Sequence, residues 1–241
     1  MNLVIDIGNS FTKLALFRAD DIVFSDRIEK FTAIYMTSIL SSYPVEQCIV
    51  SAVGRFNKKS FNSLRKKVPV LYFSSSTPIP IKNCYTTPNT LGVDRLAAAV
   101  GANSLYPSRN VLSIDSGTAI TYDLVNSEGE YIGGAISLGI VTRFRALHHY
   151  TAKLPEVTFS DSFKVVGTTT QESILSGVMN GIINEVDGYI NSVRDIYNDL
   201  VVIFTGGDAF FFEKKLKNSI FVHPNLVLLG LNRILNHNAK H

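Results

Sequence analysis

Two stretches decide the fold: residues 3–12 read LVIDIGNSFT and residues 112–121 read LSIDSGTAIT. Isoleucine, aspartate, glycine and threonine recur at matching positions without a gap. In each stretch an apolar run ends in aspartate, a glycine-containing turn follows, and a second apolar run continues to Phe17 or Val125, which is typical of a β-hairpin. We infer that the chain contains the same unit twice.

Strand-like and helical segments alternate after each hairpin, which indicates a mixed α/β fold with two related halves. The proline-containing segment 77–80 interrupts the pattern, and we place the boundary near residue 108, giving halves 1–108 and 109–241. The other expected helices cover residues 33–42, 59–67, 171–200, 231–237 and a segment from Asp94; the other expected strands cover 48–53, 70–73, 131–136 and 200–205.

The composition is that of a globular protein: 241 residues, 46% hydrophobic, 18% charged and a net charge of +3. The densest basic group, Lys58, Lys59 and 65–67, is interpreted as a solvated helix face, so we expect no nucleic-acid partner. Two cysteines without a CxxC pair indicate a reducing compartment. No run reaches the ~18 apolar residues of a membrane span. We therefore expect a cytoplasmic protein without a membrane partner.

The first hairpin turn, Asp6 to Ser10, has the composition of a phosphate-binding turn. Glycine and asparagine let backbone N–H groups converge on an anion. Asp6 would be repelled by a phosphate, so its expected role is to hold Mg²⁺, directly or through water. Lys13 would add positive charge. A plain hairpin with a Gly-Asn turn remains the alternative.

Two later turns extend this interpretation. The turn after Asp115 repeats the first with hydroxyls, and two facing turns would clamp one polyphosphate in a cleft between the halves. The alternative is that Asp115 only caps its own turn. A third turn, Gly206-Gly207, follows a buried strand, and its two glycines would let a flat group approach the backbone.

The segment from Tyr85 to Arg95 runs into an alanine-rich helix. Asp94 would lie at its N-terminus, where the helix dipole favours an ionised carboxylate that can accept a proton from a substrate hydroxyl. An ordinary N-cap is the alternative. Arg95 is disfavoured in the first helical turn, so we expect it to have a carboxylate partner in the protein or in a substrate.

Five motifs in order along the chain carry a family resemblance: DIGNS at 6–10, Tyr85 with LGVDR at 91–95, DSGTAIT at 115–121, GGAISLG at 133–139 and TGG at 205–207. Together they resemble the hallmarks of type III pantothenate kinases. The resemblance implies a duplicated ribonuclease H-like fold of the actin/Hsp70 type, with the nucleotide cleft between the halves. It also implies ATP-dependent phosphorylation of pantothenate to 4'-phosphopantothenate, the first step of coenzyme A biosynthesis.

The resemblance also implies roles for single residues. The implied ATP-binding residues are Asp6, Ile7, Gly8, Asn9, Ser10, Phe11, Thr12, Lys13, Thr118, Gly206 and Gly207. The implied pantothenate contacts are Tyr85, Gly92, Val93, Asp94, Arg95 and Thr170. Asp94 looks like the general base, Asp115 like the ligand of an activating monovalent cation (K⁺ or NH₄⁺), and Thr170 like the threonine that reaches pantothenate across a dimer interface.

Two departures from the family pattern concern local shape: Leu138 stands where proline is usual, and Leu96 where an aromatic residue is common. The helix expected over 171–200 carries a wider apolar stripe than one core face needs, and Gly177 and Gly181 would permit close helix approach. We therefore expect a homodimer. Burial of this helix within a single chain is the alternative.

Three rival functions remain open. A kinase of another small hydroxy acid would keep the fold, but a carboxylate-bearing acceptor gives Arg95 a purpose. A non-catalytic accessory or regulatory protein has little need of Asp6, Asp94 and Asp115 together. An actin-like polymerising protein is disfavoured by the short chain.

Overall fold

The computed structural model describes residues 1–8, 11–29, 32–52 and 61–239. By internal contacts the chain divides into two compact units. The first contains residues 1–107, 129–131 and 225–241, and the second contains 108–128 and 132–224. The halves 1–108 and 109–241 were expected from the sequence repeat, not from contacts. This division of the chain stays a prediction.

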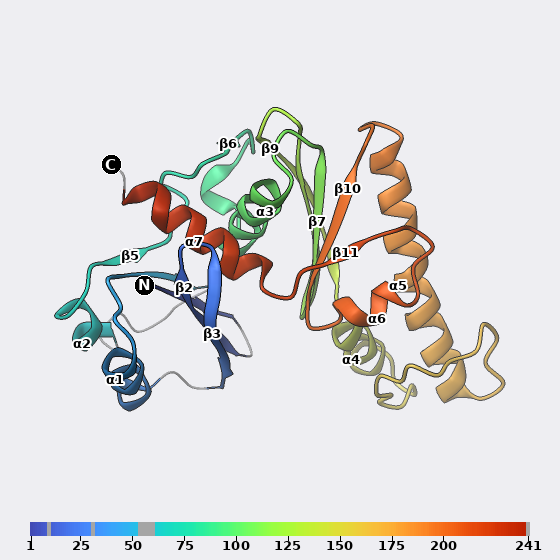
Figure 1. Ribbon diagram of the computed structural model, residues 1–241. Coiled ribbons are helices and arrows are strands. Elements are labelled where there is room, and N and C mark those ends of the chain that lie inside the picture. The colour runs from blue at the N-terminus through green and yellow to red at the C-terminus, as the bar shows by residue number, and fades with distance from the viewer. Residues whose placement is uncertain (9–10, 30–31, 53–60, 240–241) are drawn as a thin grey trace. The chain divides into compact units, whose positions relative to one another are not determined.

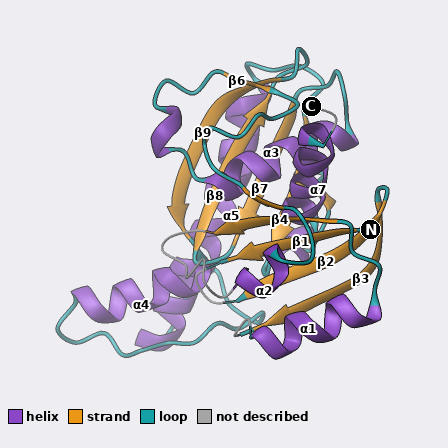
Figure 2. Ribbon diagram, turned by 90° about the vertical axis from the view of Figure 1, so that its left-hand side faces the viewer, coloured by secondary structure: helices purple, strands orange, loops and turns teal. Residues whose placement is uncertain are grey.

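The first unit is built on a five-stranded sheet with the order β3-β2-β1-β4-β5. β1 is antiparallel to β2 and parallel to β4. Figure 2 shows α1 and α2 beside this sheet. Buried side chains of the sheet form one apolar cluster with side chains of these helices. The elements are β1 (Asn2–Ile7), β2 (Thr12–Arg18), β3 (Asp21–Ile28), α1 (Ala33–Ser42), β4 (Gln47–Ala52), α2 (Asn62–Arg65) and β5 (Val70–Tyr72).

Two further helices of this unit, α3 (Val93–Leu105) and α7 (Leu226–Asn238), pack side by side (Figure 1). Glycines allow the close approach, because a β-carbon at Gly230 would overlap the Ala97 carbonyl and one at Gly101 would overlap the Leu226 carbonyl. Asn2 Nδ2 donates to Asn232 Oδ1 at 2.7 Å, which ties α7 to β1. The short elements β6 (Lys82–Asn83) and η2 (Pro88–Thr90) precede α3.

The second unit contains most of a six-stranded sheet with the order β11-β10-β7-β8-β9-β6. β6 pairs with residues 130–131 of β9, which group with the first unit. Three helices pack against β7, β8 and β10 in one apolar cluster. The elements are β7 (Val111–Ser116), β8 (Ala119–Val125), β9 (Glu130–Leu138), α4 (Ile140–Tyr150), α5 (Thr170–Arg194), β10 (Val201–Gly206), α6 (Ala209–Glu213) and β11 (Phe221–Val222).

The sheets confirm the expected α/β architecture and show the repeat in three dimensions. The order β3-β2-β1-β4-β5 of the first sheet matches β9-β8-β7-β10-β11 of the second. In both sheets the repeated aspartate lies near the end of the first strand of a hairpin. On one side this strand pairs antiparallel with the second strand of the hairpin, and on the other side it pairs with a parallel strand. The sequence repeat therefore corresponds to a repeat of the sheet.

Several expected boundaries were wrong. The helix expected to reach residue 200 ends at Arg194, and Asp199 has a φ of +53°, which a continuing helix does not allow. The last helix begins at Leu226 rather than Leu231. The helix expected over 59–67 covers Asn62–Arg65, while Lys58 and Lys59 lie outside the described residues. Within the described ranges, no helix is long and apolar enough to cross a membrane.

Candidate functional site

The first hairpin places Asp6 near the end of β1, opposite Lys13 on β2 and beside Ser51 on β4. Gly8 N–H donates to the Phe11 carbonyl at 3.0 Å, which closes the described part of the turn. Asn9 and Ser10, expected in the phosphate site, lie outside the described residues. Because directly opposite residues share a face of the sheet, the Lys13 and Asp6 side chains lie on one side of the hairpin.

The second hairpin places Asp115 opposite Thr121, and its turn consists of Gly117 and Thr118. Gly117 N–H donates to the Ala119 carbonyl at 2.9 Å. Ser116 is buried, whereas Gly117 and Thr118 are exposed. An exposed turn on two buried strands can present the Thr118 amide and hydroxyl to a ligand.

The third turn lies directly beside the second, because β10 pairs in parallel with β7 and brings Gly206 next to Ser116. Gly206 has a φ of +91°, and a β-carbon there would lie 2.5 Å from Asp115 Oδ1 and would overlap the Ser116 carbonyl oxygen. Glycine is therefore required at this position. The absent side chain leaves the Asp115 carboxylate and the Ser116 carbonyl close together, an oxygen donor set that suits a hard cation.

Asp208 connects these two turns and was missed by the sequence analysis. Its Oδ2 accepts a hydrogen bond from Ser116 Oγ at 2.9 Å. Burial raises the pKa of the Asp208 carboxyl, and the Ser116 bond partly offsets this shift. An aspartate directly after Gly-Gly is a weak signal, so only the pairing of β10 with β7 reveals the contact.

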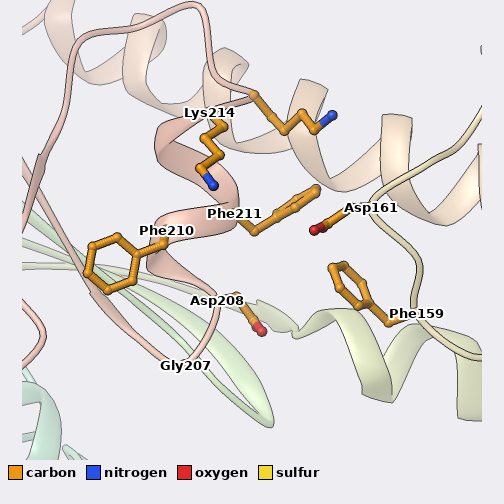
Figure 3. A pocket seen from close by; sticks show the side chains of 8 residues that line it. Phe159, Asp161, Gly207, Asp208, Phe210, Phe211 and Lys214 are labelled. Atoms are coloured by element: carbon orange, nitrogen blue, oxygen red, sulfur yellow. The ribbon is translucent and has the colours of Figure 1, made fainter.

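A pocket of about 360 Å³ opens beside Gly207 (Figure 3). Phe210 lies on one side of it and Phe159 on the other, with Asp208 between them. Phe159 and Phe211 meet edge to face, with ring centroids 5.5 Å apart. The remaining lining residues are Asp161, Lys214 and Lys215. Flat aromatic walls with carboxylates nearby can hold a planar group that carries hydrogen-bond donors.

In the first unit, Asp94 lies in the first turn of α3, whose N-cap is Gly92. The alternative of Asp94 as an ordinary N-cap is therefore wrong. Asp94 Oδ1 accepts from Arg95 N–H at 2.9 Å. A β-carbon at position 92 would lie 2.5 Å from this oxygen, so Gly92 makes room for the carboxylate. Leu96, the departure inside this motif, is buried in an unbroken helix.

Arg95 is only 6% exposed, and its Cζ lies 5.9 Å from the centre of the Tyr85 ring. This distance is within the range of a cation–π contact. The Tyr85 ring also contacts Tyr131, at 6.1 Å between centroids. The structure thus brings Tyr85, Gly92, Asp94 and Arg95 together, a carboxylate and a buried guanidinium at the start of one helix.

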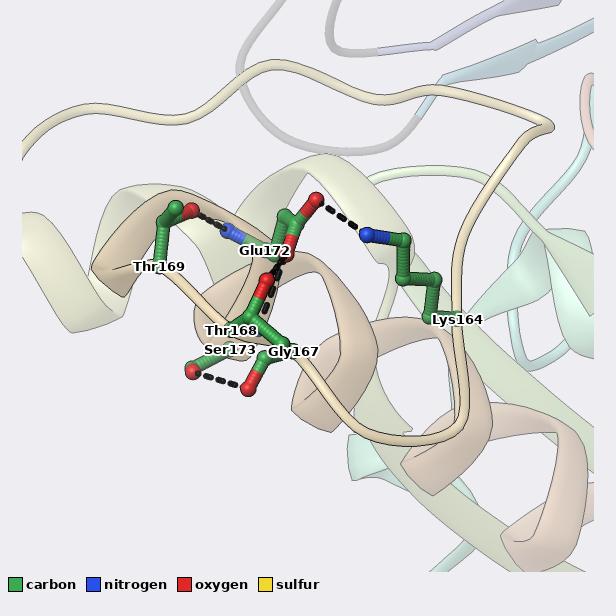
Figure 4. Close-up of polar contacts among 6 residues, drawn as sticks. All are labelled: Lys164, Gly167, Thr168, Thr169, Glu172 and Ser173. Atoms are coloured by element: carbon green, nitrogen blue, oxygen red, sulfur yellow. Dashed lines mark hydrogen bonds and ion pairs between the residues drawn. The ribbon is translucent and has the colours of Figure 1, made fainter.

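Thr170 is the exposed first residue of α5 and directly follows the N-cap Thr169. Figure 4 shows Thr169 with the polar contacts around this helix start. Thr169 Oγ1 accepts from Glu172 N–H at 3.2 Å, and Glu172 Oε2 accepts from Thr168 N–H at 2.8 Å, an arrangement similar to a capping box. Lys164 Nζ donates to Glu172 Oε1 at 2.7 Å. The Lys164 bond, followed by the Thr168 bonds, lowers the pKa of Glu172 to about 2. The helix start that carries Thr170 is therefore tightly organised.

The expected site residues form two groups, one in each unit. Asp6 to Lys13 and Tyr85 to Arg95 belong to the first; Asp115, Thr118, Thr170 and Gly206-Gly207 belong to the second. The expected cleft between the halves stays a prediction. Among the described residues, no three His, Cys, Asp or Glu side chains gather as metal ligands. A magnesium site at Asp6 would thus be completed by phosphates and water.

A family model described as "Type III pantothenate kinase" matches residues 2–192. The chain is 43% identical over 241 residues to a type III pantothenate kinase of Phocaeicola vulgatus, with 100% of each chain covered. It is 44% identical over 247 residues to one of Bacteroides fragilis, covering 99% of this chain and 98% of that protein.

Solved structures at lower identity show the fold. One is a Campylobacter jejuni protein assigned to the Baf family of transcriptional activators (TM-score 0.65, 19% identity, 99% and 100% covered). Another is a Sinorhizobium meliloti protein named as a 2-dehydro-3-deoxygalactonokinase (TM-score 0.62, 11% identity, 99% of each chain covered). The fold is the duplicated ribonuclease H-like fold of actin/Hsp70-type kinases. With full-length relatives above 40% identity and a family model matching most of its residues, this chain belongs to the type III pantothenate kinase family.

Proposed function

We propose that the chain transfers the γ-phosphoryl group of ATP to the pantothenate hydroxyl, giving 4'-phosphopantothenate for coenzyme A synthesis. The observation that carries this proposal is the start of α3. There the Asp94 carboxylate occupies the space left by Gly92, next to the buried Arg95 and the half-buried Tyr85. Phosphoryl transfer needs positioned charges and a proton acceptor more than covalent chemistry, and this arrangement offers both.

Asp94 is the proposed general base, which accepts the proton of the attacking hydroxyl. Its carboxylate lies in the first turn of α3, at the positive end of the helix dipole. The buried Arg95 binds the pantothenate carboxylate through charge-assisted hydrogen bonds, which are stronger than hydrogen bonds between neutral groups. Tyr85 lines the same place and, with the Gly92-Val93 backbone, shapes it for the substrate.

The nucleotide is proposed to contact both repeated turns. Residues 6–13, with Lys13 opposite Asp6, bind the phosphates, and Asp6 holds Mg²⁺ directly or through water. Bound Mg²⁺ would neutralise charge on the transferred group. In the second unit, Thr118 contacts the nucleotide and Gly206-Gly207 support the adenosine, with the neighbouring pocket open to its base. Asp115 binds the activating K⁺ or NH₄⁺ beside the Ser116 carbonyl.

A homodimer and a cytoplasmic location complete the proposal. Apart from the surrounding turns of α5 itself, a β-carbon added at Gly177, Gly181 or Gly188 would meet no atom of the described chain within 4 Å, so this face has room for a second helix. In a dimer, Thr170 at the exposed start of α5 would reach the partner's pantothenate. Cys48 and Cys84 are free thiols, as expected in a reducing compartment.

The test is ATP consumption by the wild type and Asp94→Asn, with pantothenate, Mg²⁺ and K⁺, and mass spectrometry of the product. We expect pantothenate-dependent turnover in the wild type and a loss of about 10²–10⁴-fold in kcat for the variant, as for removal of a general base. Asp195→Asn, an exposed aspartate at the end of α5, is the matched control and should keep full activity.

Two outcomes would contradict the proposal. If the wild type consumes ATP without forming 4'-phosphopantothenate, the acceptor is a different compound, and other small hydroxy acids become the candidates. If Asp94→Asn keeps wild-type kcat, Asp94 is not the base even when pantothenate is the substrate.

A further inference from the structure

The carbonyl oxygen of Thr118 is held by the start of α4. It accepts one hydrogen bond from Gly139 N–H at 3.1 Å and another from Thr142 Oγ1 at 2.6 Å. A carbonyl oxygen has two lone pairs, so these donors occupy both. The orientation of the Thr118 peptide in the second turn is therefore fixed by a helix that follows it by more than twenty residues.

Gly139 makes this contact possible. It is the buried N-cap of α4, and a β-carbon there would overlap the Gly117 carbonyl oxygen and lie 3.0 Å from the Thr118 oxygen. The backbone of the helix start thus lies directly on the turn. The contact is a packed backbone contact with two directed hydrogen bonds.

Arg143, the next residue of α4 after Thr142, fixes the segment that leads into Gly139. Its Nε donates to the Leu138 carbonyl at 2.8 Å, and Nη2 donates to Ser137 Oγ at 3.0 Å. The Arg143 guanidinium therefore holds the backbone at Leu138, the residue that stands where the family pattern before this glycine has proline. Leu138 itself is 48% exposed.

The same guanidinium is anchored to α5. Arg143 Nη2 pairs with Glu185 Oε2 at 2.6 Å, and Tyr122 OH donates to Glu185 Oε1 at 3.3 Å. The Arg143 side chain is 19% exposed and Tyr122 is 1% exposed. Partly buried, multiply bonded arginine holds its geometry better than an exposed ion pair.

We propose that Thr142 is a positioning residue for nucleotide binding: its hydroxyl, backed by Arg143, holds the Thr118 peptide in the orientation that contacts the nucleotide. This inference rests on the proposed function only in taking Thr118 as a nucleotide contact. α4 occupies the carbonyl side of this peptide, while Thr118 itself is exposed and can be reached by a ligand. In this proposal Thr142 acts through Thr118 and not by contacting a substrate.

The test is ADP·Mg²⁺ binding by isothermal titration calorimetry, together with the KM values for ATP and pantothenate. Thr142→Val keeps the branched shape but removes the donor, and we expect ADP affinity to fall about three- to tenfold, the effect of one hydrogen bond. The KM for ATP should rise by the same factor and the KM for pantothenate should not change. Thr142→Ser restores the hydroxyl and should recover most of the affinity.

The matched control is Thr151→Val at the other end of α4, where Thr151 Oγ1 donates to the Leu147 carbonyl at 2.7 Å. It removes the same kind of bond far along the helix from the turn and should leave ADP affinity unchanged. Arg143→Lys, which cannot make the same set of directed bonds, should weaken ADP binding in the same direction as Thr142→Val.

The proposal is overturned if Thr142→Val binds ADP like the wild type, or if Thr151→Val weakens binding as much. It is also overturned if both KM values rise together and Thr142→Ser does not restore them, since that pattern reports a general loss of structure. If the wild type binds ADP but does not phosphorylate pantothenate, the proposed function fails while the ADP affinities still decide the role of Thr142.

Discussion

The two hairpins that begin the two sheets have the same plan and different surroundings. Each pairs two antiparallel strands through six residue pairs, and each carries its aspartate one residue before the end of its first strand. The partners differ, because Asp6 lies opposite Lys13 and Asp115 lies opposite Thr121. Counted between the last paired residues, Ile7 with Thr12 and Ser116 with Ile120, the first hairpin has one residue more in its turn. Residues that match in the ungapped sequence comparison therefore do not pair alike in the two hairpins.

This difference gives the two aspartates different electrostatic neighbours. Opposite residues share a face of the sheet, so the Lys13 side chain lies on the same face as Asp6, whereas the Thr121 side chain lies on the same face as Asp115. A positive group beside the first turn favours an anion such as phosphate, and a carboxylate with oxygen neighbours at the second favours a cation. One copied motif can thus serve two kinds of ligand after a register change of a single residue.

The largest expected effect separates the two aspartates. Asp6→Asn should reduce kcat by about 10²–10³-fold in both KCl and NaCl, because the charge proposed to hold Mg²⁺ at the phosphates is lost. Asp115→Asn should instead remove the difference between the two salts. The measurement is kcat for each variant in KCl and in NaCl at equal ionic strength.

Asp21→Asn, an exposed aspartate at the start of β3, is the control for loss of one negative charge in the first unit. It should change neither kcat nor salt dependence. The distinction between the hairpins fails if Asp6→Asn and Asp115→Asn give the same salt dependence.

The next expected effect is a loss of stability when a glycine at or beside each turn is replaced by alanine. Gly139→Ala would force a methyl group into the Gly117 carbonyl, so we expect the free energy of unfolding to fall by about 2–3 kcal/mol, as for overpacking. At Gly8 a β-carbon would lie 3.2 Å from the Phe11 carbonyl oxygen, and Gly8→Ala should cost less than about 1 kcal/mol. Urea denaturation midpoints of the two variants make the measurement.

Gly117→Ala tests the same turn from its own side, because the nearest atom to a β-carbon there is 4.0 Å away. It should be nearly as stable as the wild type. If Gly8→Ala and Gly139→Ala lower the free energy of unfolding equally, the packing of α4 on the second turn is no tighter than the packing around the first turn.

Much of the fold follows from local signals in the sequence. The repeat marked both hairpins, and the α1 bounds, Ala33–Ser42, match the expected helix because a threonine N-cap precedes an apolar run. β3 was not expected. Its side chains alternate between half-buried and exposed in DIVFSDRI, a pattern with too few apolar residues to stand out from a polar loop.

Contacts between distant residues account for what the sequence analysis missed in the site. Asp94, Arg95 and Tyr85 could be grouped because they belong to one short segment. Asp208 reaches Ser116, and Thr142 reaches Thr118, only because β10 pairs with β7 and α4 packs on the turn. The residue types, a serine, a threonine and an aspartate, give no signal of these partners along the chain.

A smaller effect is expected in the pocket beside Gly207. Phe210→Ala removes an exposed aromatic wall, and the KM for ATP should rise about three- to tenfold, in line with the strength of aromatic stacking. The KM for pantothenate should not change, since the expected pantothenate contacts of the first unit do not line this pocket. Phe221→Ala, another exposed phenylalanine of the second unit, is the control. A rise in both KM values would contradict a nucleotide role for Phe210.

The smallest effect is a pH dependence of stability that comes from the link between the second and third turns. Burial raises the pKa of Asp208, so the folded state holds this proton more tightly than the unfolded state does. The contribution of Asp208 to the free energy of unfolding is therefore largest below the ordinary aspartate pKa of about 3.9 and falls as pH rises through the raised pKa. Asp208→Asn cannot ionise, so its stability relative to the wild type should increase between pH 4 and pH 7.

Glu172, in the same unit, has a lowered pKa where Asp208 has a raised one, so its pH dependence of stability has the opposite sign. It therefore serves as the reference for this measurement. Its pKa is lowered to about 2, so its contribution is present above the ordinary glutamate pKa and is lost as pH falls toward 2. Glu172→Gln should therefore lose stability relative to the wild type at pH 7 and regain parity near pH 2. The urea midpoints of Asp208→Asn and Glu172→Gln, each taken relative to the wild type, should shift in opposite directions with pH. If they shift in the same direction, burial does not set the pKa of Asp208, and the Ser116 bond that lowers this pKa must dominate.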